Sequence, residues 1–498
     1  MIHIHPTEAE FLRLAKQGNV IPVYGELLAD LETPVSAFLK LDDGRFSYLL
    51  ESVAGTEKVA RFSFLGSRPR MLITATGRHM EISSLSHGRV QVKRFETKDD
   101  PLAEIERLMS QFRFVPVPGL PRFTGGLVGY LGYNTARFLE RLPPHQIDTL
   151  RVPDLMLMLT GTMAIFDHSQ HKLLLVANVQ TDRANARAAY RQAVREVHEM
   201  ASRLRGPLPK SLRRRAGRPQ TVQANIPRAE FERMVAKAKE HIRSGDIIQV
   251  VVSQRLQRKV SCQPLDIYRM LRSVNPSPYM FLLRFGSMAL VGASPEMLVR
   301  CEDGQLETRP IAGTRRRGAT EREDERLIHQ LLSSPKERAE HLMLVDLGRN
   351  DVGRVAVAGS VKTPELIVIE KYSHVLHLVS SVTGKLKPGK NAFDVLRATF
   401  PAGTVAGAPK IRAMEIIADL ERYDRGPYAG AVGYFSYSGN LDTCITIRTV
   451  LVKDSHAYVQ AGAGIVADSQ PAREYQETLS KAQGMLKAIE LAEQRFRK

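Results

Sequence analysis

The chain of 498 residues contains no tryptophan and only three cysteines, Cys262, Cys301 and Cys444. Three scattered thiols are too few for a disulfide framework or for a cysteine-bound zinc cluster. We therefore expect these cysteines to be buried or incidental thiols.

Long apolar runs are also missing. No run approaches the ~20 residues that a membrane-spanning helix needs, and the N-terminal sequence MIHIHPTEAE lacks the basic-then-apolar pattern of a signal peptide. We expect a cytoplasmic protein with no membrane partner. Apolar residues make up 43% of the chain and charged residues 25%, as in ordinary globular proteins, and the length allows a substantial buried core.

One segment has no acidic residue. The stretch RLRGPLPKSLRRRAGRPQ (203–220) contributes seven basic residues to a net charge of +18. A basic run broken by proline and glycine is typical of a solvated linker. Nucleic-acid binding is the weaker alternative, because no interleaved aromatic residues or known binding motif accompany the run. We predict an N-terminal unit (1–200), this linker (201–224) and a second unit (225–498), with no nucleic-acid partner.

The second unit opens with a helix. IPRAEFERMVAKAKEHIRSGD places Pro227 at the helix start and Ser244-Gly245 at its end. A β-branched run at 247–256 predicts a buried strand, and further strands are expected at 280–285, 289–292, 297–301, 431–437, 443–452 and 456–461. Helices are expected at 335–350, 409–422 and 471–492, each with proline in its first turn.

Five glycine-rich or charged blocks accompany PIAGTR (310–315) in a fixed order: NPSPYMF (275–281), ERAEHLMLVDLGRNDVGRV (337–355), TFPAGTVAGAPKIRAMEII (399–417), GPYAGAVGYFSYSGNLDTCITIRT (426–449) and QAGAGIVADSQPAREYQETLSK (460–481). Together and in this order they resemble the chorismate-utilising enzymes. The resemblance implies an α+β fold in which large antiparallel sheets pack face to face, with helices outside. The smaller N-terminal unit would embrace the catalytic one.

Two expected helices each present a pair of glutamates three residues apart, and therefore on one helix face: Glu337 with Glu340, and Glu474 with Glu477. Four carboxylates brought together suit a hard ion such as Mg²⁺. The alternatives are a capping box from Ser334 to Glu337 and a surface pair of Glu477 with Lys481. The resemblance implies that Glu340, Glu474 and Glu477 bind or support Mg²⁺, with Glu337 the least certain member. The ion would hold the ring carboxylate of chorismate, near Lys481.

Three glycine-bearing segments, PIAGT, PAGTVAGAPK and QAGAGIV, can bring backbone N–H groups against an anion, although glycine turns are more often purely structural. Arg448 alternates with apolar neighbours on an expected strand, where a charge is either paired or faces a ligand. The resemblance assigns the residues that bind chorismate: Arg448, Tyr428, Thr404, Gly462 and Gly464 at the pyruvyl end, and Gly313 and Thr314 at the ring end.

Glu296 in GASPEML is, by its own pattern, only an acid near a turn. The resemblance implies that it is the general acid that protonates the departing ring hydroxyl, which requires a raised pKa. The resemblance also places His377 near that hydroxyl, with His374 as a nearby rival. A lone histidine in an apolar run is more often a core residue.

Two positions distinguish the reactions of this family. Relatives that add water to chorismate have a lysine where this chain has Gln249, and relatives that make aminodeoxychorismate commonly have a lysine where this chain has Ala312. The resemblance therefore implies that ammonia attacks the ring directly and that pyruvate is then eliminated to give anthranilate. Synthesis of aminodeoxychorismate remains the alternative.

Ammonia needs a source, and the chain has no cysteine in a glycine-flanked nucleophile turn that could act as a glutaminase. The resemblance implies a separate glutamine amidotransferase subunit and hence a heteromeric complex.

Two further segments are, by themselves, a strand end and a proline turn. The resemblance implies that they face each other and form a site for tryptophan as a feedback inhibitor. Its residues would be Glu51, Ser52, Asn275, Pro276, Pro278, Tyr279 and Met280. The absence of tryptophan from the chain fits an enzyme that must be made when tryptophan is scarce.

Overall fold

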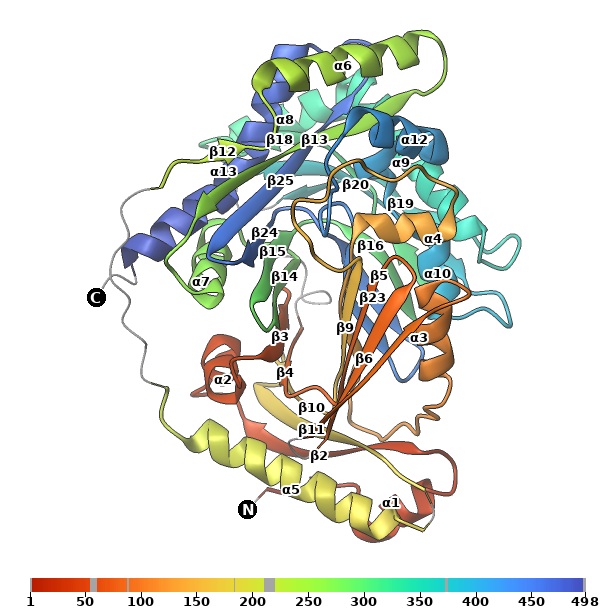
Figure 1. Ribbon diagram of the computed structural model, residues 1–498, viewed down its shortest axis with the longest axis vertical. Coiled ribbons are helices and arrows are strands. Elements are labelled where there is room, and N and C mark those ends of the chain that lie inside the picture. The colour runs from red at the N-terminus through yellow and green to blue at the C-terminus, as the bar shows by residue number, and fades with distance from the viewer. Residues whose placement is uncertain are drawn as a thin grey trace.

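The computed structural model describes residues 2–53, 61–86, 89–182, 184–209, 220–371 and 375–495. Within these ranges two large β-sheets lie face to face, and helices cover their outer faces and ends (Figure 1). The expected α+β class with large antiparallel sheets is confirmed.

The first sheet has thirteen strands. Its order is β1 (Ile4–His5), β2 (Val20–Leu28), β11 (Lys172–Gln180), β10 (Thr162–Asp167), β4 (Phe62–Ser67), β3 (Phe46–Glu51), β14 (Tyr279–Phe285), β15 (Met288–Ser294), β24 (Thr449–Lys453), β25 (His456–Ile465), β13 (Gln249–Lys259) and β12 (Gln223–Ala224), with β21 (Gly407–Ala408) also paired to β13.

The second sheet has twelve strands. Its order is β18 (Ile311–Arg316), β20 (Val375–Lys385), β17 (Gln305–Thr308), β16 (Met297–Glu302), β23 (Leu441–Ile445), β22 (Ala431–Ser436), β8 (Gly126–Leu131), β9 (Leu155–Leu159), β5 (Met71–Thr76), β6 (His79–Ser86) and β7 (Arg89–Glu96), with β19 (Lys362–Lys371) also paired to β20.

Both sheets contain strands from both predicted units. In the first sheet β3 pairs antiparallel with β14, with Leu50 opposite Phe281, and in the second β8 pairs with β22, with Tyr130 opposite Val432. The predicted units 1–200 and 225–498 therefore share their sheets. Residues 201–205 belong to helix α5 (Ala186–Arg205), β12 begins at Gln223, and 210–219 lie outside the described residues.

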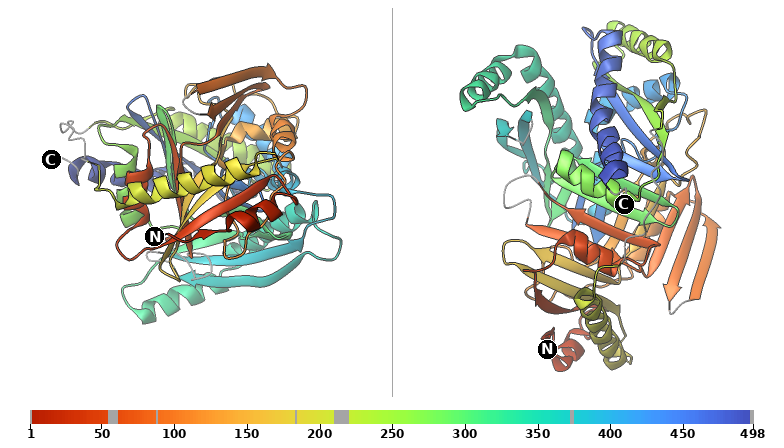
Figure 2. Two further views of the ribbon diagram at one scale, coloured as in Figure 1. Left: turned by 90° about the horizontal axis from the view of Figure 1, so that it is seen from below. Right: turned by 90° about the vertical axis from the view of Figure 1, so that its left-hand side faces the viewer.

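Helices surround the sheets. They are α1 (Glu8–Leu14), α2 (Pro34–Leu41), α3 (Pro101–Met109), α4 (Ala136–Leu139), α5, α6 (Arg228–Arg243), α7 (Pro264–Val274), α8 (Glu321–Ser333), α9 (Pro335–Gly353), α10 (Ala392–Thr399), α11 (Gly403–Ala406), α12 (Lys410–Leu420) and α13 (Pro471–Arg495), with the 3₁₀ turn η1 (Tyr133–Thr135). Helix α5 packs on β2 and β11 with α1 against it, whereas α7 and α13 pack together against β15 and β25 (Figures 1 and 2).

Helix boundaries predicted from proline and glycine are found in the structure. Helix α6 has Pro227 as its N-cap residue and ends at the cap Ser244, followed by Gly245 with a φ of 82°. A positive φ at this position favours glycine because it has no Cβ. Helices α9 and α13 begin at Pro335 and Pro471, and Pro409 is the N-cap of α12.

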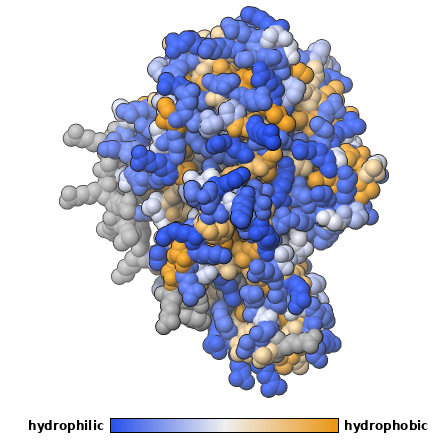
Figure 3. Space-filling view, turned by 45° about the vertical axis from the view of Figure 1, so that its right-hand side comes forward, coloured by the Kyte–Doolittle hydropathy of each residue, from blue (hydrophilic) through white to orange (hydrophobic). Residues whose placement is uncertain are grey.

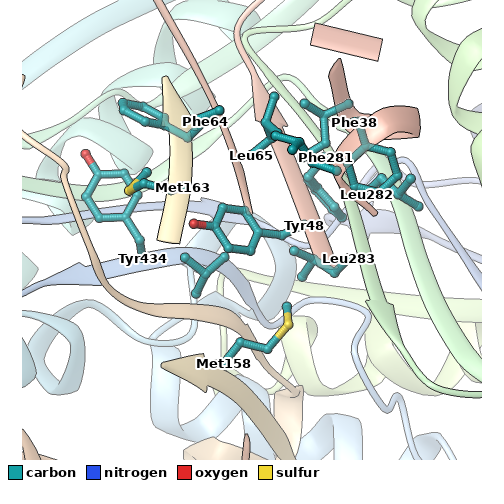
Figure 4. Close-up of a cluster of buried hydrophobic side chains, with 14 of the residues drawn as sticks. Phe38, Tyr48, Phe64, Leu65, Met158, Met163, Phe281, Leu282, Leu283 and Tyr434 are labelled. Carbon is teal, nitrogen blue, oxygen red and sulfur yellow. The ribbon is translucent and has the colours of Figure 1, made fainter. Parts of the chain in front are cut away.

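The main core lies between the two sheets. Tyr48, Phe64 and Phe281 of the first sheet and Met158 and Tyr434 of the second gather there, with their side chains buried (Figure 4). Along β8, alternation sends Val128 and Tyr130 into this core and Leu127 and Leu131 into the other core, which helices cover. Burial of apolar surface at roughly 25 cal/mol per Å² on both faces of such strands stabilises the layered arrangement.

The single strand predicted at 443–452 is wrong. Strand β23 ends at Ile445 in the second sheet, and β24 begins at Thr449 in the first. Between them Arg448 has a left-handed backbone with a φ of 51°, so it is not a strand residue as predicted. The β-branched run on both sides hid the break, because periodicity does not record a change of sheet.

The face shown in Figure 3 is largely hydrophilic, and its apolar residues form separate areas. Among the described residues, no helix combines the length and apolar character needed to cross a membrane.

Candidate active site

A cavity of about 780 Å³ opens where β13 and β25 of the first sheet approach β18, β20 and helices α9 and α13. It brings together nearly all the residues predicted to be catalytic, to bind substrate or to bind metal. These are Gln249, Glu296, Ala312, Gly313, Glu337, Glu340, His377, Thr404, Tyr428, Arg448, Gly462, Gly464, Glu474, Glu477 and Lys481. The side chain of Thr314 and the whole of His374 lie outside the described residues.

Glu296 lies in the turn between β15 and β16 and faces this cavity. Its Oε2 accepts a hydrogen bond of 3.0 Å from the Oγ1 of Thr404. Burial raises the pKa of Glu296, although Thr404 and the positive charges of Lys481 and Arg448 partly oppose this effect. The carboxyl group is therefore placed to hold a proton, as a general acid must.

His377 enters from β20, opposite Thr314 of β18, next to a bulge in the pairing. Gly313 forms the bulge with a φ of 59°. Burial lowers the pKa of His377, and a hydrogen bond with the Gly313 backbone partly counteracts this shift. Burial at the cavity wall therefore favours the neutral imidazole.

Arg448 and Lys481 form the cationic part of the cavity. Nη1 of Arg448 donates to the backbone carbonyl of Lys481 at 2.8 Å, and burial lowers the pKa of the guanidinium. Nζ of Lys481 donates to the carbonyl of Gly462 at 3.0 Å and pairs with Glu477 at 2.7 Å. Within the described part of the chain, Arg448 has no carboxylate within ion-pair distance, so its charge is available to an anionic ligand.

Two glycines of β25 make room for neighbouring side chains. A Cβ at Gly462 would lie 2.6 Å from Oη of Tyr428, and a Cβ at Gly464 would lie 2.7 Å from Nε2 of Gln249. Real Cβ atoms do not approach other atoms so closely. These glycines therefore allow Tyr428 and Gln249 to reach the cavity.

The predicted magnesium ligands come from α9 and α13 on the cavity wall. Burial raises the pKa of Glu340, and the charges of Glu337 and Glu477 raise it further. Burial also raises the pKa of Glu474, with a further contribution from Glu477. Carboxylates that repel one another in this way favour a cation between them, and Mg²⁺ binds through one or two carboxylates together with water and substrate oxygens.

Two of the four glutamates already have partners. Glu337 pairs with Arg315 at 3.0 Å, and Glu477 pairs with Lys481 at 2.7 Å. Half of the alternative capping box is present, since Ser334 accepts the Glu337 N–H at 3.4 Å. No three acidic, histidine or cysteine side chains in the described ranges form a ready metal cluster. The other two, Glu340 and Glu474, have no ion-pair partner among the described residues, and a Mg²⁺ ion bound through few protein carboxylates would take its remaining oxygens from water and substrate.

The two positions predicted to distinguish the reactions of chorismate-utilising enzymes carry no amine. Gln249 at the start of β13 is buried, and its hydrogen bond lowers the pKa of Glu340. Ala312 lies on β18 at the same cavity. Neither side chain can serve as a base or as an amine nucleophile.

A second, smaller cavity lies beside the paired strands β3 and β14. It is lined by Glu51, Ser52, Pro278, Tyr279 and Met280, as predicted for the regulatory site. Its volume of about 60 Å³ is below the ~150 Å³ that accepts benzene in an engineered cavity, so an indole would need side chains to move. Asn275 and Pro276 line the larger cavity instead, and Pro278 lines both.

Sequence reasoning did not identify Glu421 and Arg425, which lie behind the cavity. The guanidinium of Arg425 is 0% exposed, and its Nη2 lies 2.6 Å from Oε1 of Glu421. The sequence does contain an acidic and a basic residue four positions apart here. That spacing normally indicates a surface helix pair.

Known proteins of similar sequence share one family. A family model described as chorismate binding enzyme matches residues 48–487. Anthranilate synthase component 1 of Acetivibrio thermocellus is 47% identical over 98% of this chain and 99% of its own length. The protein of the same name from Pseudomonas putida is 48% identical over 97% of this chain and 98% of its own length.

Solved structures agree on the fold. Anthranilate synthase component I from Streptococcus pneumoniae superposes with a TM-score of 0.75 at 37% identity, covering 92% of this chain and 98% of that one. The menaquinone-specific isochorismate synthase of Escherichia coli has a TM-score of 0.71 at 17% identity, covering 97% and 98% of the two chains, which supports the fold alone. The chain belongs to the chorismate binding enzyme family.

Proposed function

We propose that this protein is the large subunit of an anthranilate synthase of tryptophan biosynthesis, which converts chorismate and ammonia to anthranilate, pyruvate and water. The observation that carries this proposal is that one cavity holds a buried carboxyl group with a raised pKa at Glu296, whereas positions 249 and 312 carry glutamine and alanine and not lysine. We assign chorismate as the substrate because the chain belongs to the chorismate binding enzyme family. The missing lysines leave ammonia as the nucleophile.

Chorismate is a dianion, and the cavity offers a cationic and hydrogen-bonding end for one carboxylate. Arg448 and the hydroxyl of Tyr428 line that end, and Gly462 and Gly464 keep the β25 backbone open beside it. Binding there would replace the hydration of the carboxylate with fixed donors, which orients the ring toward Glu296.

The ring carboxylate would lie at the other end, near Glu340 and Glu474. These two residues would hold Mg²⁺, with Glu337 and Glu477 in support. When bound, the ion would neutralise the ring carboxylate and fix its position.

Chemistry then proceeds in two stages. Ammonia forms a C–N bond at the ring carbon beside the carboxylate while the ring C–O bond breaks, and Glu296 donates the proton with which the hydroxyl leaves as water. The ring carbon that carries the nitrogen then loses its proton, and the bond between the ring and the enolpyruvyl oxygen breaks, which leaves an aromatic ring. The released enolpyruvate takes up a proton to give pyruvate. Neutral His377 lies at the same wall and can hydrogen-bond the departing hydroxyl.

Ammonia would come from a separate glutamine amidotransferase subunit. We further propose that tryptophan inhibits the enzyme by binding beside β3 and β14, where Ser52 and Met280 line the small cavity. Inhibition of ammonia-dependent turnover by added tryptophan, and its loss in Met280→Ala, would support that site. Undiminished activity at saturating tryptophan would rule it out.

The decisive experiment incubates the purified chain, without a partner, with chorismate, Mg²⁺ and ammonium salt at mildly alkaline pH. We expect anthranilate, identified by its fluorescence and mass. Aminodeoxychorismate as the only product would transfer the assignment to that branch, and isochorismate or salicylate would contradict the role given to Gln249. Unchanged chorismate would contradict the proposed activity.

A further inference from the structure

The buried pair Glu421 and Arg425 lies directly behind the candidate active site. Nε of Arg425 donates to Oε2 of Glu421 at 2.8 Å and Nη2 donates to Oε1 at 2.6 Å. Glu421 Oε1 also accepts from the backbone N–H and the hydroxyl of Ser253, at 2.7 and 3.0 Å. The ion pair is fully buried and held in one geometry.

The remaining donors of Arg425 reach two backbone carbonyls. Nη1 donates to the carbonyl of Val405 at 2.8 Å, and Nη2 donates to that of Val251 at 2.7 Å. The guanidinium plane also lies 4.6 Å from the ring centre of Tyr133 and 5.6 Å from that of Tyr428. One side chain thus joins α11, β13 and the turn before β22.

Each contact lies next to a residue of the cavity. Val405 follows Thr404, whose hydroxyl donates to Glu296, and Val251 lies two residues after Gln249 on β13. Tyr428 is itself in the cavity wall. The guanidinium of Arg425 therefore contacts the backbone beside Thr404, the strand that carries Gln249, and the ring of Tyr428.

Stability alone is a weak reason for this arrangement. Burying two charges has a large desolvation cost, and buried ion pairs can often be replaced by apolar residues without loss of stability. A bidentate, planar guanidinium does, however, fix the relative positions of the groups it bridges.

We propose that Glu421 and Arg425 act as a positioning pair, which holds Thr404 against Glu296 and thereby sets the geometry of the acid. This inference rests on the proposed function, in which Glu296 is the proton donor.

The first variant to test is Arg425→Lys. Lysine keeps the charge opposite Glu421 but, as a single compact ammonium, cannot bond both carbonyls in the same geometry. We expect kcat to fall on the order of tenfold to a hundredfold, part of what a positioned general acid contributes. The KM for chorismate should change less than kcat, because Arg448 is not moved and Tyr428 meets the guanidinium only through its ring, at 5.6 Å.

The pH profile gives a readout that a purely structural role would not change. The groups facing Glu296 are Thr404 from α11, Arg448 and Tyr428 from loops beside the second sheet, and Lys481 from α13. The Thr404 hydrogen bond lowers the pKa of Glu296. Its loss should move the alkaline limb of kcat, measured at constant free ammonia, to higher pH.

A double-mutant cycle tests the route through Thr404. Thr404→Val should shift the alkaline limb in the same direction as Arg425→Lys, and adding Arg425→Lys to Thr404→Val should produce little further change in kcat or in the limb. Arg258→Lys is the matched control. Arg258 lies on β13, the strand that carries Val251, and forms a buried ion pair with Glu493 at 2.5 Å, away from the cavity. The Arg258→Lys enzyme should be less stable than the wild type, but the alkaline limb of its kcat profile should not move.

Additive effects of Arg425→Lys and Thr404→Val, or an unmoved alkaline limb in an active Arg425→Lys enzyme, would overturn the proposal. If Arg425→Lys does not fold, Ser253→Ala takes its place in the cycle, since it removes one hydrogen bond to Glu421 and leaves the ion pair intact. The product formed by the wild-type enzyme distinguishes a failure of the positioning role from a failure of the proposed function. Anthranilate formation with an additive cycle contradicts only the positioning role, whereas no anthranilate from the wild type contradicts the proposed function and this inference with it.

Discussion

At the scale of single residues, Glu296 matters most for the proposed chemistry. Replacement by glutamine keeps the size of the side chain and an acceptor for Thr404 but removes the acidic proton. We expect Glu296→Gln to lower kcat by about 10²- to 10⁴-fold, the usual contribution of a general acid, with the melting temperature nearly unchanged. Anthranilate fluorescence with ammonium as the nitrogen source measures the effect.

Glu302→Gln provides the control for this variant. Glu302 ends β16, the strand that follows Glu296, and its carboxylate is 39% exposed and 3.4 Å from Arg122. It should retain activity. A Glu296→Gln enzyme with a wild-type rate would remove this residue from the mechanism.

Gly462 is a position where only glycine fits. Alanine there would place a Cβ 2.6 Å from the Tyr428 hydroxyl and must displace it. We expect Gly462→Ala to raise the KM for chorismate at least several-fold by moving Tyr428. Steady-state kinetics with varied chorismate measure this change.

Gly484→Ala is the matched substitution in α13, where an added Cβ meets no atom within 4 Å. It should leave KM unchanged and stabilise the helix by about 0.5–1 kcal/mol, as alanine does relative to glycine inside a helix. An unchanged KM in Gly462→Ala would show that Tyr428 does not contact the substrate.

At the scale of elements, the prediction of a Mg²⁺ site depends on α9 and α13. Each helix presents two glutamates three residues apart, and therefore on one face. Glu340→Gln and Glu474→Gln should each weaken Mg²⁺ binding by about tenfold or more, since each removes one of the few protein carboxylates that such an ion uses. Glu477→Gln should have a smaller effect because Glu477 is already paired with Lys481.

Calorimetric titration of the chain with Mg²⁺ measures these affinities independently of turnover. Glu490→Gln, an exposed residue on the same helix α13 that pairs with Lys487 at 3.4 Å, is the control and should bind as the wild type does. Equal affinity in all four variants would place the ion elsewhere.

Elements also show where sequence reasoning succeeds. Helices α6, α9, α12 and α13 were predicted within a few residues, because proline at a helix start and glycine beyond its end act locally. The break at Arg448 was missed. Two β-branched strands that join different sheets give the same local pattern as one long strand.

At the scale of the whole molecule, the two halves of the chain cannot be separated. Strand β14 pairs with β3, and β22 pairs with β8, so residues 225–498 alone would expose two strand edges and the apolar core between the sheets. We expect this fragment to aggregate or to lack cooperative thermal unfolding, and co-expression with residues 1–209 to restore a folded complex. Circular dichroism and size-exclusion chromatography measure both outcomes.

A soluble, monomeric 225–498 fragment that unfolds cooperatively would contradict this expectation. As a control, cleavage within 210–219 of the intact protein leaves every pairing described above in place, and the cleaved chains should remain associated.

Local features could be predicted from the sequence: helix starts and ends, strands with alternating burial, and the ordered motifs that supply Glu296, Arg448 and the four glutamates. These depend on the chemistry of neighbouring residues. Tertiary structure alone decided which strands pair across the two halves, that Asn275 and Pro276 face the larger cavity, and that Glu421 and Arg425 are buried behind it. Pairing and burial depend on groups far apart in the chain, so a spacing of four residues predicts a surface pair until packing places it in the core.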